Sequence, residues 1–249
     1  MSGRQAKVPM PVVWAMVPTY NERENIVELV GQIRQQPGDI EVLIVDDHSP
    51  DGTGDIADGL AAADPHVHVL HRLHERGRAS AGIAGFKAAL ANPAVELIVE
   101  MDADFSHDPR DVPRLIQAAA AADVAIGSRY VPGGRQVNCT PRNILFSRVI
   151  NLVNRFVLGV RAHDASGGFK CYRRRVLETI ELDHYLAREY AVGVETLLKC
   201  QAHGFTFKEI PITFVNRRLG KSKANLRVLT EYPVSILRLW LQLVQGKVR

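Results

Sequence analysis

Three short apolar segments of the chain each run directly into polar and acidic residues. Residues 42–45 are followed by Asp46 and Asp47, and the same change of character comes after Val17 and after Met101. Apolar runs of this length are typical of strands that are buried on both faces of a parallel sheet. Because ligands of open α/β sheets bind outside the carboxyl ends of the strands, we expect one crevice where the three strand ends meet.

Strands and helices alternate over the first half of the chain, and this alternation predicts an α/β fold with a mainly parallel sheet flanked by helices. The expected strands lie near residues 12–17, 41–46, 67–71, 95–101 and 123–128, and the expected helices near 24–35, 54–63, 79–91 and 111–121. Beyond Arg129 the pattern changes. An amphipathic helix over 142–160, a helix over 192–202 and a strand over 206–214 are expected to form the acceptor-side half.

The acids after the third apolar segment point to a divalent cation. Asp102 and Asp104 are one residue apart, so an extended strand would place both side chains on the same face. An isolated Asp-x-Asp is more often a solvated turn or a helix cap, but its position after an apolar strand favours a Mg²⁺ or Mn²⁺ site that also binds phosphate. We expect Ser49 or Asp51 to cap the helix that begins near residue 54, and Asp47 to face the ligand.

Two familiar phosphate-binding patterns are absent from the sequence. There is no Gly-x-x-x-x-Gly-Lys loop, and no Gly-x-Gly-x-x-Gly follows the first expected strand. A phosphate-loop hydrolase and a dinucleotide oxidoreductase are therefore disfavoured.

An ordered set of motifs resembles the polyprenol-phosphate (dolichol-phosphate) mannose synthases, which are inverting glycosyltransferases of the GT-A fold. The resemblance runs from about Val12 to the region of Lys223. The motifs are Pro18-Thr19-Tyr20-Asn21-Glu22, Asp46-Asp47, Asp102-Ala103-Asp104, Gly127-Ser128-Arg129-Tyr130, Gly167-Gly168-Phe169, and Arg217 with Gly220-x-Ser222-Lys223. The resemblance implies transfer of a hexose, mannose from GDP-mannose, to a polyprenyl or dolichyl phosphate with inversion and assistance by Mg²⁺ or Mn²⁺.

The same resemblance implies a role for each matching residue. The nucleotide-sugar residues would be Pro18, Tyr20, Glu22, Val45, Asp47, Asp102, Ala103, Asp104, Arg129, Arg217 and Lys223. The metal ligands would be Asp102, Asp104 and Ser106, the acceptor-phosphate residues Arg129, Arg142 and Ser147, and the catalytic residues Asp102, Asp104 and Arg129.

The chain departs from the family pattern at several positions that bear on the substrate. Where relatives often carry Gly-Leu-Gly-x-Ala-Tyr, it reads Gly77-Arg78-Ala79-Ser80-Ala81-Gly82. Ser106 stands where a glutamine is common, and Asn143 where an arginine is common. Two alternatives remain open: a same-fold enzyme that uses glucose or a soluble specialised-metabolite acceptor, and a degenerate GT-A binding or scaffold subunit. Retention of the acids and of the basic positions disfavours the second.

The expected organisation is a disordered tail over residues 1–9, a catalytic domain over 10–224 and a C-terminal amphipathic helix over 225–249. Residues 228–244 are interrupted by Glu231, Pro233 and Arg238, so they fall short of the roughly 20 apolar residues of a spanning helix. This helix could lie on a membrane surface or pack against the catalytic domain or an anchoring partner subunit. The net charge of +4 favours anionic partners. We expect a nucleotide sugar, a lipid phosphate and a membrane surface as partners, no nucleic acid, and a peripheral location at the cytoplasmic face.

Overall fold

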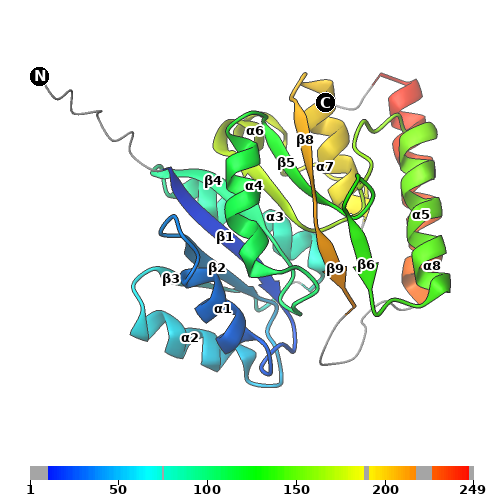
Figure 1. Ribbon diagram of the computed structural model, residues 1–249. Coiled ribbons are helices and arrows are strands. Elements are labelled where there is room, and N and C mark those ends of the chain that lie inside the picture. The colour runs from blue at the N-terminus through cyan, green and yellow to red at the C-terminus, as the bar shows by residue number, and fades with distance from the viewer. Residues whose placement is uncertain (1–10, 75, 188–190, 217–225, 247–249) are drawn as a thin grey trace, which may run out of the picture.

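The computed structural model describes residues 11–74, 76–187, 191–216 and 226–246, and these form a sheet with helices on both sides (Figure 1). The strands are β1 (Val12–Thr19), β2 (Glu41–Asp46), β3 (Val67–His71), β4 (Val95–Glu100), β5 (Val124–Ser128), β6 (Arg135–Val137), β7 (Lys170–Arg173), β8 (Phe207–Pro211) and β9 (Thr213–Val215). The helices are α1 (Ile26–Arg34), α2 (Thr53–Ala63), α3 (Arg78–Ala91), η1 (a 3-10 turn, Pro109–Asp111), α4 (Val112–Ala119), α5 (Pro141–Phe156), α6 (Arg174–Thr179), α7 (Ala191–Ala202) and α8 (Leu226–Val244).

The main sheet has seven strands in the order β3-β2-β1-β4-β7-β5-β8. All the strands expected in the first half of the chain are present. β1 to β4 pair with one another in parallel, and β7 runs antiparallel between β4 and β5. The expected strand over 206–214 is two strands. β8 joins the main sheet beside β5, and β9 pairs with β6 in a separate two-stranded sheet.

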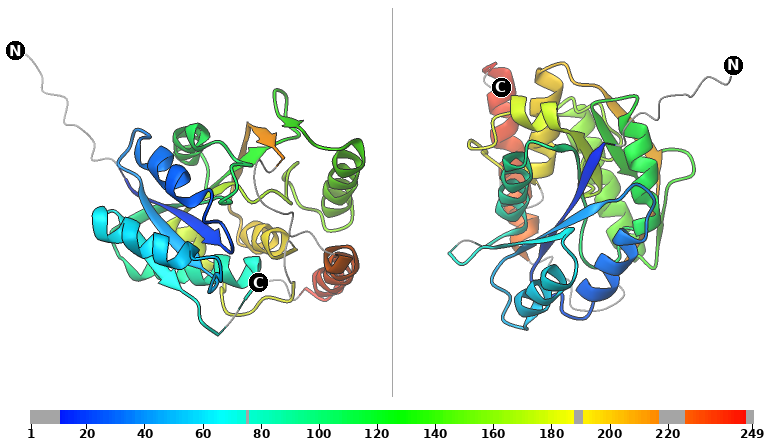
Figure 2. Two further views of the ribbon diagram at one scale, coloured as in Figure 1. Left: turned by 90° about the horizontal axis from the view of Figure 1, so that it is seen from below. Right: turned by 90° about the vertical axis from the view of Figure 1, so that its left-hand side faces the viewer.

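Alternation along β1 explains why helices cover both faces. Val13, Ala15 and Val17 pack with α1, α2 and α4, whereas Trp14 and Met16 pack with α3, α6 and α7 (Figure 2). Since successive strand residues point to opposite faces, one apolar strand supplies both cores.

One close approach fixes α3 on the sheet at Gly85. A Cβ added to Gly85 would lie 2.6 Å from Met16 Cγ and 3.0 Å from Val45 Cγ2. Only glycine allows the helix backbone to come this near to β1 and β2.

The acceptor-side helix and the C-terminal helix lie side by side at one end of the molecule (Figures 1 and 2). α5 begins where the Thr140 hydroxyl accepts the amide hydrogen of Asn143 at 3.3 Å. α8 buries Tyr232, Ile236 and Leu239 in the core, so its inner face packs on the catalytic part of the chain.

Two of the expected boundaries fall outside the described residues, namely the tail over 1–9 and the junction at 224. That division of the chain therefore stays a prediction. None of the helices in the described part of the chain is long and apolar enough to cross a membrane.

Candidate functional site

The ends of β1 and β2 meet in a network centred on Asp46. Its Oδ1 accepts the hydroxyls of Thr19 at 3.2 Å and of Ser49 at 2.5 Å, and its Oδ2 accepts the Ser49 amide at 3.1 Å. Asp51 accepts the amide hydrogen of Thr53, the first residue of α2, at 3.0 Å. The N-cap of α2 is Gly52, without a side-chain cap, so the capping expectation was wrong; Asp51 binds the first helical amide from the residue before the cap, and Ser49 holds Asp46.

Asp47 lies at the same strand end but is buried against the start of α3. Its Oδ1 is paired with Arg72, and its Oδ2 accepts the Gly77 amide at 2.8 Å. Burial raises the pKa of the Asp47 carboxyl, and the Gly77 hydrogen bond and the Arg72 charge oppose this rise. Its expected contact with a nucleotide stays a prediction.

The residues expected to line a nucleoside come together at the end of β1. Pro18 and Val45 are neighbours in the parallel register of β1 and β2. The guanidinium of Arg76 lies 5.6 Å from the centre of the Tyr20 ring. Glu22 is buried, and its Oε2 accepts a hydrogen bond from Asn25 at 2.9 Å.

The acids after β4 are arranged differently from the expectation. β4 ends at Glu100, so Asp102 and Asp104 do not belong to an extended strand, and the same-face argument was wrong. The chain turns through a left-handed residue, Phe105, with φ of 58°. In this turn Asp104 Oδ1 accepts the amide hydrogen of Ser106 at 3.0 Å. A tight turn, rather than strand alternation, sets the direction of the two carboxylates.

His107 packs against this turn and holds it by a hydrogen bond. Its ring is buried and stacks on Phe169 with centroids 4.9 Å apart. Its Nδ1 accepts the amide hydrogen of Asp102 at 3.3 Å. Burial lowers the pKa of His107, although the charges of Asp102 and Asp104 oppose this. Through its Nδ1 the imidazole positions the backbone at Asp102.

Arg129, at the end of β5, forms a two-pronged ion pair with Asp164. Its Nε and Nη2 donate to the two carboxylate oxygens of Asp164, each at 2.7 Å, and its amide donates at 2.9 Å. Burial disfavours the charged carboxylate, but the hydrogen bonds from Arg129 outweigh it and hold the pKa of Asp164 below its usual value. Because the two side chains are only 10% and 0% exposed, this pair is part of the structural core of the site.

The other residues expected to contact an acceptor phosphate lie on α5. Arg142 is exposed in the first turn, and the hydroxyl of Ser147 is hydrogen bonded to the Tyr130 hydroxyl at 2.5 Å. Arg217 and Lys223, expected to contact the donor, lie outside the described residues.

The residues at the end of β4 suit a hard divalent cation that arrives with its substrate. Among the residues described in the structure, no group of three or more His, Cys, Asp or Glu side chains could hold a metal. Mg²⁺ and Mn²⁺ commonly use only one or two carboxylates and complete their coordination with water and substrate phosphate. Asp102 and Asp104, with the Ser106 hydroxyl nearby in sequence, match that donor chemistry.

Several residues of the site were not singled out from the sequence. Arg72 directly follows β3, so its position at the end of a further expected strand could have indicated that it belongs to the site. Lys170 is buried at the start of β7 and donates to the carbonyl of Gly167. Asp164 lies 35 residues from Arg129, and nothing in the local sequence indicates that the two pair.

The sequence of this chain is similar to those of known glycosyltransferases. A family model described as glycosyl transferase family 2 matches residues 14–181. A polyprenol monophosphomannose synthase of Mycolicibacterium smegmatis is 46% identical over 84% of this chain and 79% of its own length. An undecaprenyl-phosphate mannosyltransferase of Micrococcus luteus is 42% identical over 91% of this chain and 93% of its own.

The fold recurs in solved structures. A mannosyltransferase of Pyrobaculum calidifontis in complex with GDP-Man and Mn²⁺ has a TM-score of 0.61 at 21% identity, over 92% of this chain and 65% of that one. The expected α/β fold of the GT-A type is therefore confirmed, as is the resemblance to polyprenol-phosphate mannose synthases. The chain is a glycosyltransferase and belongs to glycosyl transferase family 2.

Proposed function

We propose that this chain transfers a mannosyl group from GDP-mannose to a polyprenyl phosphate, with inversion at the anomeric carbon. The names of the two near full-length relatives support the sugar and the carrier. The strand-end acids support the donor half of the reaction. The lipid acceptor depends on one further observation, an apolar groove beside Arg142.

The donor half would use the ends of β1, β2 and β4. Pro18, Tyr20, Glu22, Val45 and Asp47 would line the nucleoside. Asp102 and Asp104, with Ser106, would hold Mg²⁺ or Mn²⁺ beside the diphosphate. When bound, this ion supplies charge neutralisation that makes the nucleoside diphosphate a better leaving group.

The acceptor half needs little base catalysis. A phosphate monoester has a second pKa near 6, so it is largely dianionic at neutral pH and is itself the nucleophile. The work of the protein is to hold two anionic groups in line, for which arginine is well suited. Arg142 would contact the acceptor phosphate, with Ser147 beside it, and Arg129 is the third expected contact.

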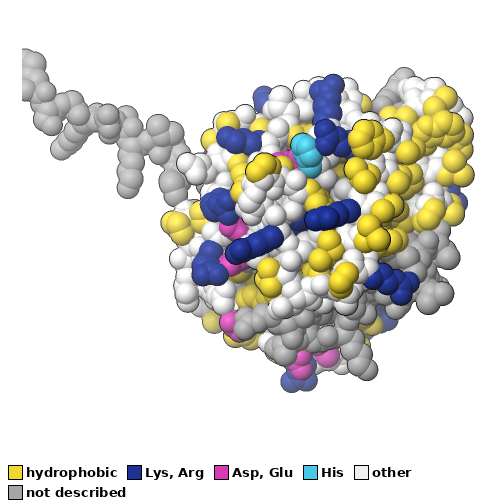
Figure 3. Space-filling model, turned by 45° about the vertical axis from the view of Figure 1, so that its right-hand side comes forward, with side chains coloured by type: hydrophobic (Ala, Val, Ile, Leu, Met, Phe, Trp, Pro, Cys, Tyr) yellow, Lys and Arg dark blue, Asp and Glu magenta, His cyan; other side chains and the backbone are white. Residues whose placement is uncertain are grey.

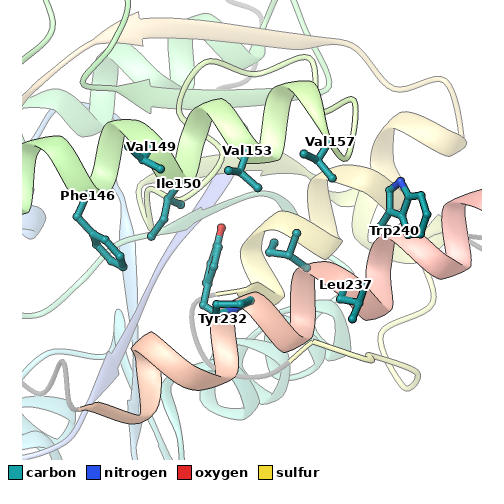
Figure 4. Close-up of a pocket in the computed structure, with 10 residues that line it drawn as sticks. Phe146, Val149, Ile150, Val153, Val157, Tyr232, Leu237 and Trp240 are labelled. Carbon is teal, nitrogen blue, oxygen red and sulfur yellow. The ribbon is translucent and has the colours of Figure 1, made fainter.

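An apolar groove runs between α5 and α8 and carries the proposal of a lipid acceptor. It encloses about 380 Å³ and is lined by Phe146, Val149, Ile150, Val153, Val157, Tyr232, Pro233, Ile236, Leu237 and Trp240 (Figure 4). Arg142 is four residues before Phe146, so it lies on the same side of α5 one turn nearer the helix start. A phosphate at Arg142 could therefore extend an isoprenoid chain into the groove.

α5 and α8 carry an exposed apolar surface that includes the open side of this groove. Figure 3 shows apolar side chains gathered on this side of the molecule. The exposed members are Leu145, Phe146, Val149, Leu152, Phe156 and Val157 on α5, and Val234, Leu237, Trp240, Leu241 and Val244 on α8. Arg148, Arg155 and Arg238 are exposed among them. Apolar residues flanked by basic ones fit the surface of an anionic membrane, where the carrier lipid resides.

A transfer assay with separate acceptors tests the proposed function. Radiolabelled GDP-mannose should yield mannosyl lipid with a polyprenyl phosphate and no product with soluble hydroxyl or phosphate acceptors. Arg142→Ala should raise the KM for polyprenyl phosphate about 10- to 100-fold, because a hydrogen bond to a charged group contributes roughly 1.5–3 kcal/mol. The Kd for GDP-mannose should not change.

Arg161→Ala is the control, since it removes an exposed arginine that follows α5 and is not part of this apolar and basic surface. An Arg142→Ala variant with weaker donor binding and unchanged lipid saturation would contradict the acceptor assignment. A wild type that uses only soluble acceptors would overturn the proposed lipid substrate.

Membrane contact can be tested without disturbing the core. Replacing Leu152 and Leu237, which are 53% and 57% exposed, with glutamate should lower binding to anionic vesicles at least about tenfold. GDP-mannose binding should persist. The control is Val27→Glu, which adds one of the two charges at a residue 53% exposed on α1. Undiminished co-sedimentation of the double variant with vesicles would refute this surface as the contact.

A further inference from the structure

Arg78 ties the start of α3 to the acids at the end of β4. Its Nε donates to Asp102 Oδ1 at 2.9 Å, and its Nη1 donates to Glu100 Oε1 at 2.8 Å. The side chain is 26% exposed. It therefore reaches the crevice while remaining bonded to two carboxylates.

Two glycines leave the space that this guanidinium occupies. A Cβ at Gly82 would lie 3.4 Å from Arg78 Nη1, and a Cβ at Gly168 would lie 3.0 Å from Arg78 Nη2. Gly82 and Arg78 are both positions at which the chain departs from the family pattern. The two departures are neighbours in space, because the guanidinium of Arg78 lies against Gly82.

The position of Arg78 matters for the electrostatics of donor binding. An empty pair of carboxylates repels a diphosphate, so an acidic site ordinarily needs the metal first. An arginine is charged at every physiological pH, and it attracts a phosphate even while it pairs with a carboxylate. The first turn of α3, which carries Arg78, adds the partial positive charge of a helix N-terminus.

We propose that Arg78 is a donor-site cation that neutralises Asp102 before the metal arrives, so that the nucleoside diphosphate binds first and then recruits the ion. This inference rests on the proposed function for the identity of the donor. It assigns two effects of opposite sign to one side chain. Arg78 strengthens metal-free binding of the nucleotide, and it weakens binding of a divalent ion to the nucleotide-free protein by competing for Asp102.

Arg78→Gln separates the two effects. Titration calorimetry with GDP in EDTA should show an affinity about tenfold or more below that of the wild type, since a charge-assisted contact is lost. Titration of the nucleotide-free variant with Mn²⁺, followed by the electron paramagnetic resonance signal of the free ion, should show an affinity several-fold above wild type. A merely structural role for Arg78 would lower both affinities.

Two further variants complete the test. Arg78→Lys keeps the charge and should retain metal-free GDP affinity within about threefold of wild type. Arg34→Gln removes a partly buried arginine that pairs with Asp39 and Asp64, and it should change neither affinity. Arg34 also donates to the carbonyl of Ile40, just before β2. Arg34 therefore lies near the amino end of β2, whereas the crevice lies at the carboxyl ends of the strands.

The inference is overturned if Arg78→Gln binds Mn²⁺ no better than wild type, or if its metal-free GDP affinity is unchanged. It is also overturned if Arg78→Lys loses as much GDP affinity as Arg78→Gln. Any of these three results, in a wild type that still transfers mannose to polyprenyl phosphate, leaves the proposed function intact. A wild type that binds no GDP even with Mn²⁺ overturns the proposed donor and the inference with it.

Discussion

Asp104→Asn is expected to lower divalent-dependent mannosyl transfer by more than about 100-fold. A neutral amide stabilises Mg²⁺ or Mn²⁺ far less than a carboxylate, and metal polarisation is worth several kcal/mol at the transition state. The fold should persist, because an asparagine oxygen can still accept the Ser106 amide that Asp104 accepts at 3.0 Å. Initial rates over a range of Mn²⁺ concentrations, together with thermal unfolding, measure both effects.

Asp108→Asn provides a matched control in the same segment. Asp108 caps η1 by accepting the amide hydrogen of Arg110 at 2.9 Å, so its replacement removes one carboxylate near the turn. Its transfer activity should stay within about threefold of wild type. Full activity of Asp104→Asn, or of the wild type in excess chelator, would refute the metal assignment.

Asp164→Asn is expected to lower the free energy of unfolding by about 3–5 kcal/mol. It leaves the Arg129 guanidinium, only 10% exposed, without a charged partner, and breaking a buried ion pair is costly for this reason. Urea denaturation of wild type and variant measures the difference. Asp183→Asn removes a carboxylate that is 71% exposed and paired with Lys87, so it should leave the free energy of unfolding nearly unchanged.

The double variant Arg129→Met with Asp164→Asn separates structure from catalysis at this pair. Removing the stranded charge should recover more than half of the lost stability. Transfer activity should remain low in the double variant, since Arg129 is expected to contact the acceptor phosphate. Recovery of activity along with stability would contradict the expected contact between Arg129 and the acceptor phosphate. A stability loss below 1 kcal/mol in Asp164→Asn would mean that the pair contributes little to the fold.

The first half of the fold could be predicted because its physics is local. β1, β2, β4 and β5 each contain a run of apolar residues, and helices alternate with the first five strands along the chain. β7 was missed because Lys170–Arg173 is only four residues long and includes charged residues. Its pairing with β4 and β5 brings together segments far apart in the sequence, and no local period encodes that contact.

The site shows the same division between local and distant information. The acids at the strand ends were visible because polar residues after an apolar run are a local signal. The wrong inference at Asp102 and Asp104 came from extending β4 past Glu100, where the strand ends and a turn that includes the left-handed Phe105 follows. Partners such as Asp164 for Arg129, or Arg78 for Asp102, depend on tertiary packing that one sequence does not display.

The contact at Gly85 holds the middle of α3 against the sheet. Gly85 is wedged against Met16 and Val45, and Arg78 is seven residues, or about two turns and 10 Å, nearer the helix start. Because α3 is one continuous helix held at its middle, a movement of its start would carry the neighbouring residues there along together. A displacement of the helix start would therefore act on the Gly77 hydrogen bond to Asp47 and on the Arg78 bond to Asp102 at once, so a single helix links the β2 and β4 sides of the crevice.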